Sequence, residues 1–132
     1  MKILLAEDDV NIRSITKMTL ERMGGHLVVA VENGAQAVDI AARESFDLLI
    51  LDGMMPELDG FEACSQIKSV EGPCQFSPVI FMTAKSQASD IQEGFNRGAI
   101  GYIVKPFDVK TLCDEIQSLY QHHIEESYGQ AA

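Results

Sequence analysis

Tryptophan is absent from the 132-residue chain, aromatic residues make up only 7% of it, and basic residues are half as numerous as acidic ones. Ten Lys and Arg against twenty Asp and Glu give a formal net charge of −10 at pH 7. Nucleic acids and anionic lipid headgroups are repelled by such a surface on average, and no basic cluster offsets the repulsion. The composition therefore predicts neither direct nucleic-acid binding nor membrane attachment.

Cysteine is also sparse, and its spacing matches neither a zinc site nor a disulfide framework. Cys64, Cys74 and Cys113 form no CxxC pair and are odd in number, which is typical of small apolar residues in a reducing compartment. The apolar run after Lys2 is too short for a signal peptide or a membrane span. We expect a cytoplasmic protein.

The chain does contain enough apolar sequence for one buried core. Hydrophobic residues make up 46% and charged residues 23%, which are ordinary values for a globular protein. A length of 132 residues suits one domain. We expect this domain to cover residues 1–125, followed by a short C-terminal tail over 126–132.

The apolar pattern changes period repeatedly along the chain. Short aliphatic runs predict strands at residues 2–6, 26–31, 47–51, 78–82 and 100–104. Helical spacing predicts helices at residues 10–23, 35–43, around 61–67, 86–97 and from the N-cap Asp108 to about Glu125. In the first helix, the spacing predicts a core-facing stripe of Ile12, Ile15, Thr19 and Met23.

Strands and helices that alternate in this way predict an α/β fold. The run over residues 47–51 is apolar on both faces, which indicates a parallel sheet covered by helices on both sides. The expected architecture is a single doubly wound domain, a five-stranded parallel sheet flanked by five helices with right-handed crossovers. Ligands of such sheets bind outside the carboxyl ends of the strands.

Polar residues that can bind a ligand or take part in a reaction follow four of the five predicted strands. They are Glu7-Asp8-Asp9, Asp52, Thr83-Ala84-Lys85 and Lys105-Pro106. Two carboxylates about 4 Å apart repel by about 1 kcal/mol in water and about 4 kcal/mol at an effective dielectric of 20. A divalent cation offsets this repulsion, and an all-oxygen site suits Mg²⁺ better than zinc.

We therefore expect Asp8, Asp9 and Asp52 to form a Mg²⁺ site together with a phosphoryl group. The alternative is that Asp8-Asp9 only caps the first helix, but one Asp suffices for a cap and Asp52 would stay unexplained. A carboxylate is already ionised at neutral pH and attacks phosphorus to form an aspartyl phosphate. Lys105, and Thr83 with the Ala84 N–H, would hold the other phosphoryl oxygens.

Four motifs in order resemble the response-regulator receiver domain, the CheY-like family of two-component phosphorelay systems. They are Glu-Asp-Asp at 7–9, Leu-Asp-Gly-Met-Met-Pro-Glu-Leu-Asp-Gly at 51–60, Met-Thr-Ala at 82–84 and Gly-Tyr-Ile-Val-Lys-Pro-Phe at 101–107. The resemblance covers residues 2–124. It implies a flavodoxin-like sheet in the order 2-1-3-4-5, which the spacing alone does not determine.

The resemblance also implies a signalling role in place of substrate turnover. Asp52 would take a phosphoryl group from a histidine kinase or a histidine phosphotransfer protein, with Mg²⁺ or Mn²⁺ as cofactor. The metal would be held by Asp8, Asp9, Asp52 and the Met54 backbone carbonyl. Thr83, Ala84 and Lys105 would bind the phosphoryl group, and the Lys105–Pro106 peptide would be cis, which proline tolerates.

Two further pairs of residues take roles from the family. Thr83 and Tyr102 would be the switch that couples phosphorylation to the face formed by the fourth helix, fifth strand and fifth helix. Met54 and Lys85 would tune the lifetime of the aspartyl phosphate. The output would be a downstream effector protein or a covalently attached domain absent from this chain, with a weak homodimer as another outcome.

Three other functions share parts of this pattern. A haloacid-dehalogenase-class phosphatase needs a second Asp two residues after the nucleophile, where this chain has Met54. A flavodoxin-like electron carrier needs a phosphate-binding loop after the first strand, where this chain has three acids. A phosphorylation-independent pseudo-receiver, acting as an interaction module, usually lacks one of the site residues, and none is missing here.

Overall fold

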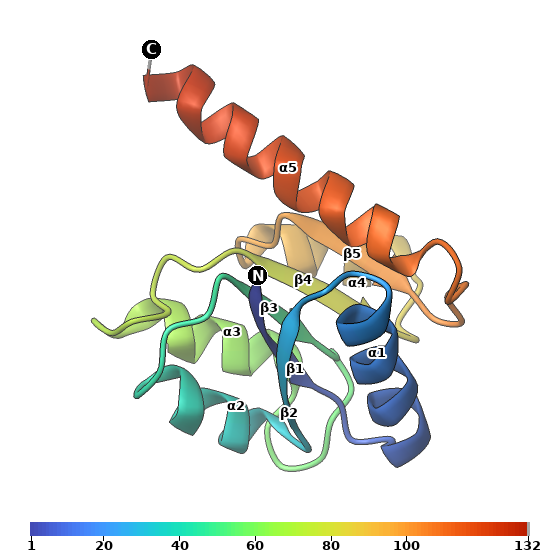
Figure 1. The fold of residues 1–132 in the computed structure, drawn as a ribbon. Helices are drawn as coiled ribbons and strands as arrows, with labels where there is room; N and C mark the ends of the chain where they lie inside the picture. Colours follow the sequence, from blue (N-terminus) through green and yellow to red (C-terminus); the bar gives the residue numbers. More distant parts are fainter. Residues whose placement is uncertain (132) are drawn as a thin grey trace.

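The computed structural model describes the backbone of residues 1–131 and the side chains of residues 1–127, and strands alternate with helices along it (Figure 1). The described strands are β1 (Lys2–Ala6), β2 (Leu27–Val31), β3 (Leu48–Leu51), β4 (Val79–Thr83) and β5 (Gly101–Val104). The described helices are α1 (Val10–Arg22), α2 (Gly34–Ala41), α3 (Gly60–Ser69), α4 (Ala88–Asn96) and α5 (Leu112–Ala131). The predicted alternation is confirmed.

All neighbouring strands are parallel, and the sheet has the order β2-β1-β3-β4-β5. The register aligns Leu4 of β1 with Val29 of β2 and Leu49 of β3. The chain reverses its winding beside β1, so the carboxyl ends of β1 and β3 lie next to each other at one edge. That edge is where a doubly wound sheet binds ligands.

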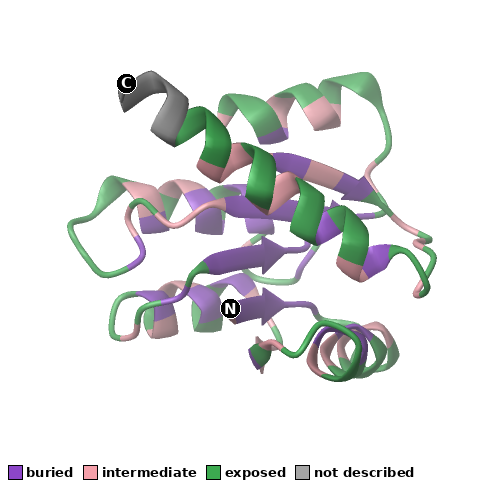
Figure 2. Cartoon of the chain, turned by 45° about the horizontal axis from the view of Figure 1, so that its top comes forward, coloured by how far each residue is buried: buried purple, intermediate pink, exposed green. Residues whose placement is uncertain are grey.

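Alternate residues of the strands enter two separate cores, one on each face of the sheet. Leu4, Leu49 and Phe81 pack with α2 and α3 on one face, whereas Leu5, Ile50 and Ile80 pack with α1 and α5 on the other. Figure 2 shows the central strands buried and the helices exposed on their outer sides. Because helices cover both faces of the sheet, the strands are continuous runs of apolar residues without polar alternation.

The expected core stripe of α1 is wrong in two positions. Ile15 is 41% exposed and Met23 is 59% exposed, whereas the buried residues of the helix are Thr16, Thr19 and Leu20. Thr19 can be buried because its hydroxyl donates to the backbone oxygen of Ile15 at 2.7 Å. Thr19 of the expected stripe is therefore confirmed as a core residue, whereas the apolar spacing did not predict the burial of Thr16 and Leu20.

Helix α5 begins later and ends later than the sequence predicts. The carbonyl oxygen of Asp108 accepts from the backbone nitrogens of Thr111 at 3.1 Å and Leu112 at 3.0 Å. Asp108 therefore opens a turn, and the helix begins at Leu112 and continues past Glu125 to Ala131. Within the described residues, no helix is both long enough and apolar enough to cross a bilayer.

The segment between Asp52 and α3 is packed tightly on both sides. A Cβ atom on Gly60 would collide with the carbonyl oxygen of Asp52, and one on Gly34 would collide with that of Leu58. Glu57, inside the same segment, has a φ of 69°. The backbone that carries Asp52 is therefore held in place by close contacts that only glycine permits.

Candidate functional site

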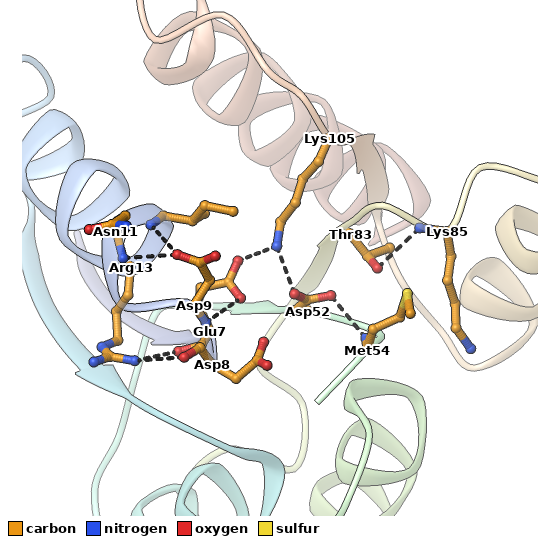
Figure 3. A network of polar contacts seen from close by, with 11 residues as sticks. Glu7, Asp8, Asp9, Asn11, Arg13, Asp52, Met54, Thr83, Lys85 and Lys105 are labelled. Atoms are coloured by element: carbon orange, nitrogen blue, oxygen red, sulfur yellow. Dashed lines mark hydrogen bonds and ion pairs between the residues drawn. The ribbon is translucent and has the colours of Figure 1, made fainter. Parts of the chain in front are cut away.

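The polar residues that follow β1, β3, β4 and β5 meet at one edge of the sheet (Figure 3). Glu7 directly follows β1, Asp52 follows β3, Thr83 ends β4 and Lys105 follows β5. Glu7, Asp52 and Thr83 are buried, with 0%, 4% and 0% of their surface exposed. Parallel pairing explains the convergence, because it brings the carboxyl ends of all strands to the same side.

Lys105 is the cation at the centre of the cluster. Its Nζ donates to Asp52 Oδ2 at 2.7 Å and also to Glu7 Oε1. Only 11% of the Lys105 side chain is exposed, against 5% for Asp52 and 1% for Glu7. The Lys105–Pro106 peptide bond is cis, as the resemblance implies.

Burial and the shared ammonium act in opposite directions on Glu7. Burial raises the pKa of the Glu7 carboxyl to about 7, the neighbouring Asp52 raises it as well, and Lys105 lowers it. Burial alone would lower the pKa of Lys105, but its bonds to Asp52 and Glu7 outweigh this and raise it. The ammonium is therefore charged at neutral pH, while the pKa of Glu7 stays above its ordinary value because of burial.

Three carboxylates lie close enough to share a cation. One oxygen from each of Glu7, Asp8 and Asp52 lies within 4.8 Å of the others. Asp8 is exposed, so this group opens to solvent on one side. Hard oxygen donors of this kind suit Mg²⁺.

Asp9 faces elsewhere, which corrects the expected metal set of Asp8, Asp9 and Asp52. Its Oδ1 accepts from the backbone nitrogens of Asn11 at 2.9 Å and Ile12 at 3.1 Å, so Asp9 is the N-cap of α1. A cap uses the carboxylate oxygen to satisfy free N–H groups of the first helical turn. Glu7, from the same acidic run, is the residue that lies with Asp8 and Asp52.

The second oxygen of Asp52 is held by the backbone. Met54 N donates to Asp52 Oδ1 at 2.9 Å, and the Met54 side chain is 54% exposed beside the site. Lys85 N donates to the buried Thr83 Oγ1 at 3.3 Å, and Lys85 Nζ lies 5.0 Å from the centroid of the Phe61 ring. Ala84, between them, is exposed.

Tyr102 joins β5 to the loop that follows β4. Its hydroxyl donates to the backbone oxygen of Lys85 at 2.8 Å, and its ring centroid lies 6.3 Å from that of Phe81. Burial, followed by the charges of Asp90, Asp52 and Glu93, raises the pKa of Tyr102 to about 12. Tyr102 is thus a neutral donor that holds the loop carrying Ala84 and Lys85.

Sequence reasoning missed Arg13, which lies in α1 directly behind the acidic loop. Its Nη1 donates to the carbonyl oxygen of Glu7 at 2.9 Å and to that of Asp8 at 3.4 Å. The only signal in the sequence is a basic residue six positions after an acidic one. This spacing alone predicts no contact, because Arg13 reaches the Glu7 carbonyl only after the chain has turned from β1 into α1.

These features define a class of protein: a doubly wound parallel sheet whose carboxyl edge gathers carboxylates around one lysine. The family model described as the response regulator receiver domain matches residues 3–117. The chain therefore belongs to the response-regulator receiver family of two-component signalling proteins. Membership leaves no support for the dehalogenase-class phosphatase or the flavodoxin-like electron carrier.

Named relatives agree with this assignment. The transcriptional regulatory protein ResD of Bacillus subtilis is 35% identical over 130 residues, which cover 98% of this chain and 52% of ResD. The structure of chemotaxis protein CheY4 of Vibrio cholerae has a TM-score of 0.81 at 31% identity, over 89% of this chain and 97% of that one. The chain spans about half the length of the curated relatives that it matches.

A further solved structure concerns the metal. The receiver domain of sensor histidine kinase PA1611 from Pseudomonas aeruginosa has a TM-score of 0.80 at 31% identity, over 91% of this chain and 97% of that one. In that structure a magnesium ion is coordinated in the active-site cleft.

Proposed function

We propose that this chain is a phosphoacceptor receiver domain in which Asp52 takes a phosphoryl group from a histidine kinase or a histidine phosphotransfer protein, in a Mg²⁺-dependent reaction. One observation carries the proposal. The buried Asp52 carboxylate has one oxygen bonded by Lys105 Nζ at 2.7 Å and the other by Met54 N at 2.9 Å, beside Glu7 and Asp8. We also propose a cytoplasmic location, where such donors act.

The donor set fits Mg²⁺, or Mn²⁺ in its place. Asp8, Asp52 and the Met54 carbonyl would hold the ion, with Glu7 in the position that Asp9 does not fill. Bound Mg²⁺ would neutralise charge on the phosphoryl oxygens and orient the group. The magnesium ion in the PA1611 receiver domain supports this assignment.

The remaining side chains act on the phosphoryl group by position and charge. Asp52 needs no general base, because its carboxylate is the nucleophile. The Lys105 ammonium, already bonded to Asp52, would stabilise a phosphoryl oxygen as charge develops on it. The Thr83 hydroxyl and the Ala84 N–H would bind another oxygen, since Thr83 ends β4 at the edge of the site and Ala84 follows it directly.

An apolar hollow beside the site would seat the phosphodonor protein. Its lining comes from α1 and from the segments that follow β4 and β5: Ile12, Ile15, Ala84, Lys105, Pro106, Phe107 and Val109. Ala84 and Lys105 belong to both the hollow and the site, so a donor seated there would present its histidine toward Asp52. The exposure of Ile15, unexpected for a core residue, supports this use of α1.

The switch would act through the loop that follows β4. Movement of Thr83 toward the phosphoryl group would pull on Lys85, whose carbonyl accepts from Tyr102, and would change the face made by α4, β5 and α5. A partner couples to this change only if it binds the two states unequally.

The charge of this face favours a partner other than a second copy of the chain. Helix α4, strand β5 and helix α5 contain acidic residues but no Lys or Arg, so the same face on two copies would repel. We therefore propose an effector or an attached output domain as the partner.

The test of the proposal is the mass of the intact protein after incubation with acetyl phosphate. We expect a gain of one phosphoryl group with Mg²⁺ and none with excess EDTA, because the metal balances the charge of the approaching phosphate. An unchanged mass with Mg²⁺, together with failure to bind beryllofluoride, would favour the pseudo-receiver.

Substitutions of Met54 and Lys85 should change the lifetime of the aspartyl phosphate more than its rate of formation. Met54 lies two residues after Asp52 and Lys85 two residues after Thr83, and neither side chain bonds to the Asp52 carboxylate in the described structure, so we expect both to control access of water to the acyl phosphate. Decay is followed by intact mass after removal of acetyl phosphate, for wild type, Met54→Ala and Lys85→Ala. Equal decay rates in all three proteins would refute this role.

A further inference from the structure

We propose that Arg13 is a positioning residue for the metal-binding loop: it holds the backbone of Glu7 and Asp8 so that their carboxylates point at one place. This inference rests on the proposed function, because it concerns the affinity of the same site for Mg²⁺. The bonds go to the backbone carbonyls of two prospective metal ligands, whereas an ion pair with their carboxylates would compete with the metal.

The contacts of Arg13 are directed and largely shielded from water. Nη1 donates to the Glu7 carbonyl at 2.9 Å and lies 3.4 Å from the Asp8 carbonyl, while Nη2 is 3.8 Å from Glu32 Oε1. The Arg13 side chain is 17% exposed, against 66% for Glu32. The carbonyl contacts are therefore the ordered part of the arrangement, and the ion pair with Glu32 contributes little.

Arg13 completes a set of bonds that hold the loop from several directions (Figure 3). Glu7 N donates to the Val31 carbonyl of β2 at 3.1 Å, and the Asp9 side chain is fixed by the start of α1. The carbonyls of Glu7 and Asp8 are bound by one guanidinium nitrogen. That nitrogen stands at the end of a rigid planar group, whereas the lysine ammonium is a point charge on a shorter, flexible stem and would not be held at the same place.

The positive charge of Arg13 and its hydrogen bonds to the loop predict opposite effects of substituting this residue on Mg²⁺ binding. A guanidinium near the site repels a divalent cation, so if charge decided the matter, losing Arg13 would strengthen Mg²⁺ binding and a lysine would preserve it. If position decides, both substitutions weaken binding. Removing groups that orient metal ligands typically costs about 10- to 100-fold in metal affinity, so we expect the second result.

The experiment measures the Kd for Mg²⁺ by calorimetric titration of the full chain, without phosphodonor. We expect Arg13→Lys and Arg13→Met each to raise the Kd by about 10-fold or more. The matched control is Arg22→Met, which removes an exposed positive charge from the same helix and should leave the Kd within about twofold of wild type. At saturating Mg²⁺, both Arg13 variants should be phosphorylated by acetyl phosphate at nearly the wild-type rate.

Tighter Mg²⁺ binding by Arg13→Met, or a wild-type Kd in Arg13→Lys, would overturn the proposal. Thermal unfolding in EDTA identifies a variant that does not fold. If Arg13→Met does not fold, the proposal is judged from the Kd of Arg13→Lys alone. Glu32→Gln should leave the Kd unchanged, and a Kd raised as far as in Arg13→Lys would assign the effect to the ion pair. Wild type that binds no Mg²⁺ would contradict the proposed function, whereas equal binding by wild type and variants contradicts only the role of Arg13.

Discussion

Asp52→Asn is expected to abolish the Mg²⁺-dependent gain of a phosphoryl group and, in metal-free buffer, to raise the free energy of unfolding. Function is lost because an amide is a poor nucleophile toward phosphorus. Stability rises because, without a metal, Glu7 and Asp52 share the Lys105 ammonium beside the Asp8 carboxylate, and the variant leaves Lys105 bonded to Glu7. We expect an increase on the order of 1 kcal/mol, since repulsion between nearby carboxylates is relieved.

Urea unfolding with EDTA and with Mg²⁺ measures the expected change in the free energy of unfolding. Mg²⁺ at ten times its Kd should stabilise wild type by about 1.4 kcal/mol by mass action and should stabilise Asp52→Asn much less. The matched control is Asp114→Asn at an exposed position of α5, which should behave as wild type in both assays. Persistent labelling of Asp52→Asn would move the phosphoacceptor to another residue.

Lys105→Met should slow phosphorylation of Asp52 by about 10²- to 10³-fold at saturating Mg²⁺, the usual effect of losing one donor that stabilises developing charge. The methionine side chain keeps most of the volume of lysine but cannot donate to a phosphoryl oxygen. The rate is measured by intact mass over time with acetyl phosphate. Lys110→Met removes the same charge from an exposed position, and equal rates in the two variants would contradict the role of Lys105.

The same substitution should make stability more sensitive to pH. The pKa of Glu7 is about 7, above its ordinary value of 4.5, so between these values the folded chain binds more protons than the unfolded chain. Stability therefore falls as pH rises through this window. Without Lys105, the contact that lowers this pKa is lost, so the fall should continue above pH 7. Urea unfolding of Lys105→Met at pH 6 and pH 8.5 should show the larger deficit at pH 8.5.

The local sequence was sufficient to predict the helices and strands, and to predict that Asp52 and Lys105 belong to the site. Apolar runs ending at Asp52 and Lys105 predict strands whose last residues meet, because parallel pairing aligns carboxyl ends. The convergence of these two residues could be anticipated without coordinates. The core face of α1 could be anticipated only in part: Thr19 is buried as expected, but Thr16 is buried as well, and the burial of a hydroxyl group depends on contacts that a linear pattern does not contain.

By itself, the sequence determined that this is an α/β sheet with an acidic carboxyl edge, and its motifs placed it in the receiver family. Only the tertiary structure decided that Glu7 turns inward beside Lys105 while Asp9 caps α1, and that Arg13 reaches back to the loop that carries both. The reason is physical. Three adjacent acids have nearly the same intrinsic preferences, and the direction of each side chain depends on how the chain leaves β1 and enters α1. That path is set by contacts with β2 and β3 and with Lys105, which follows β5 and lies 98 positions from Glu7 along the chain.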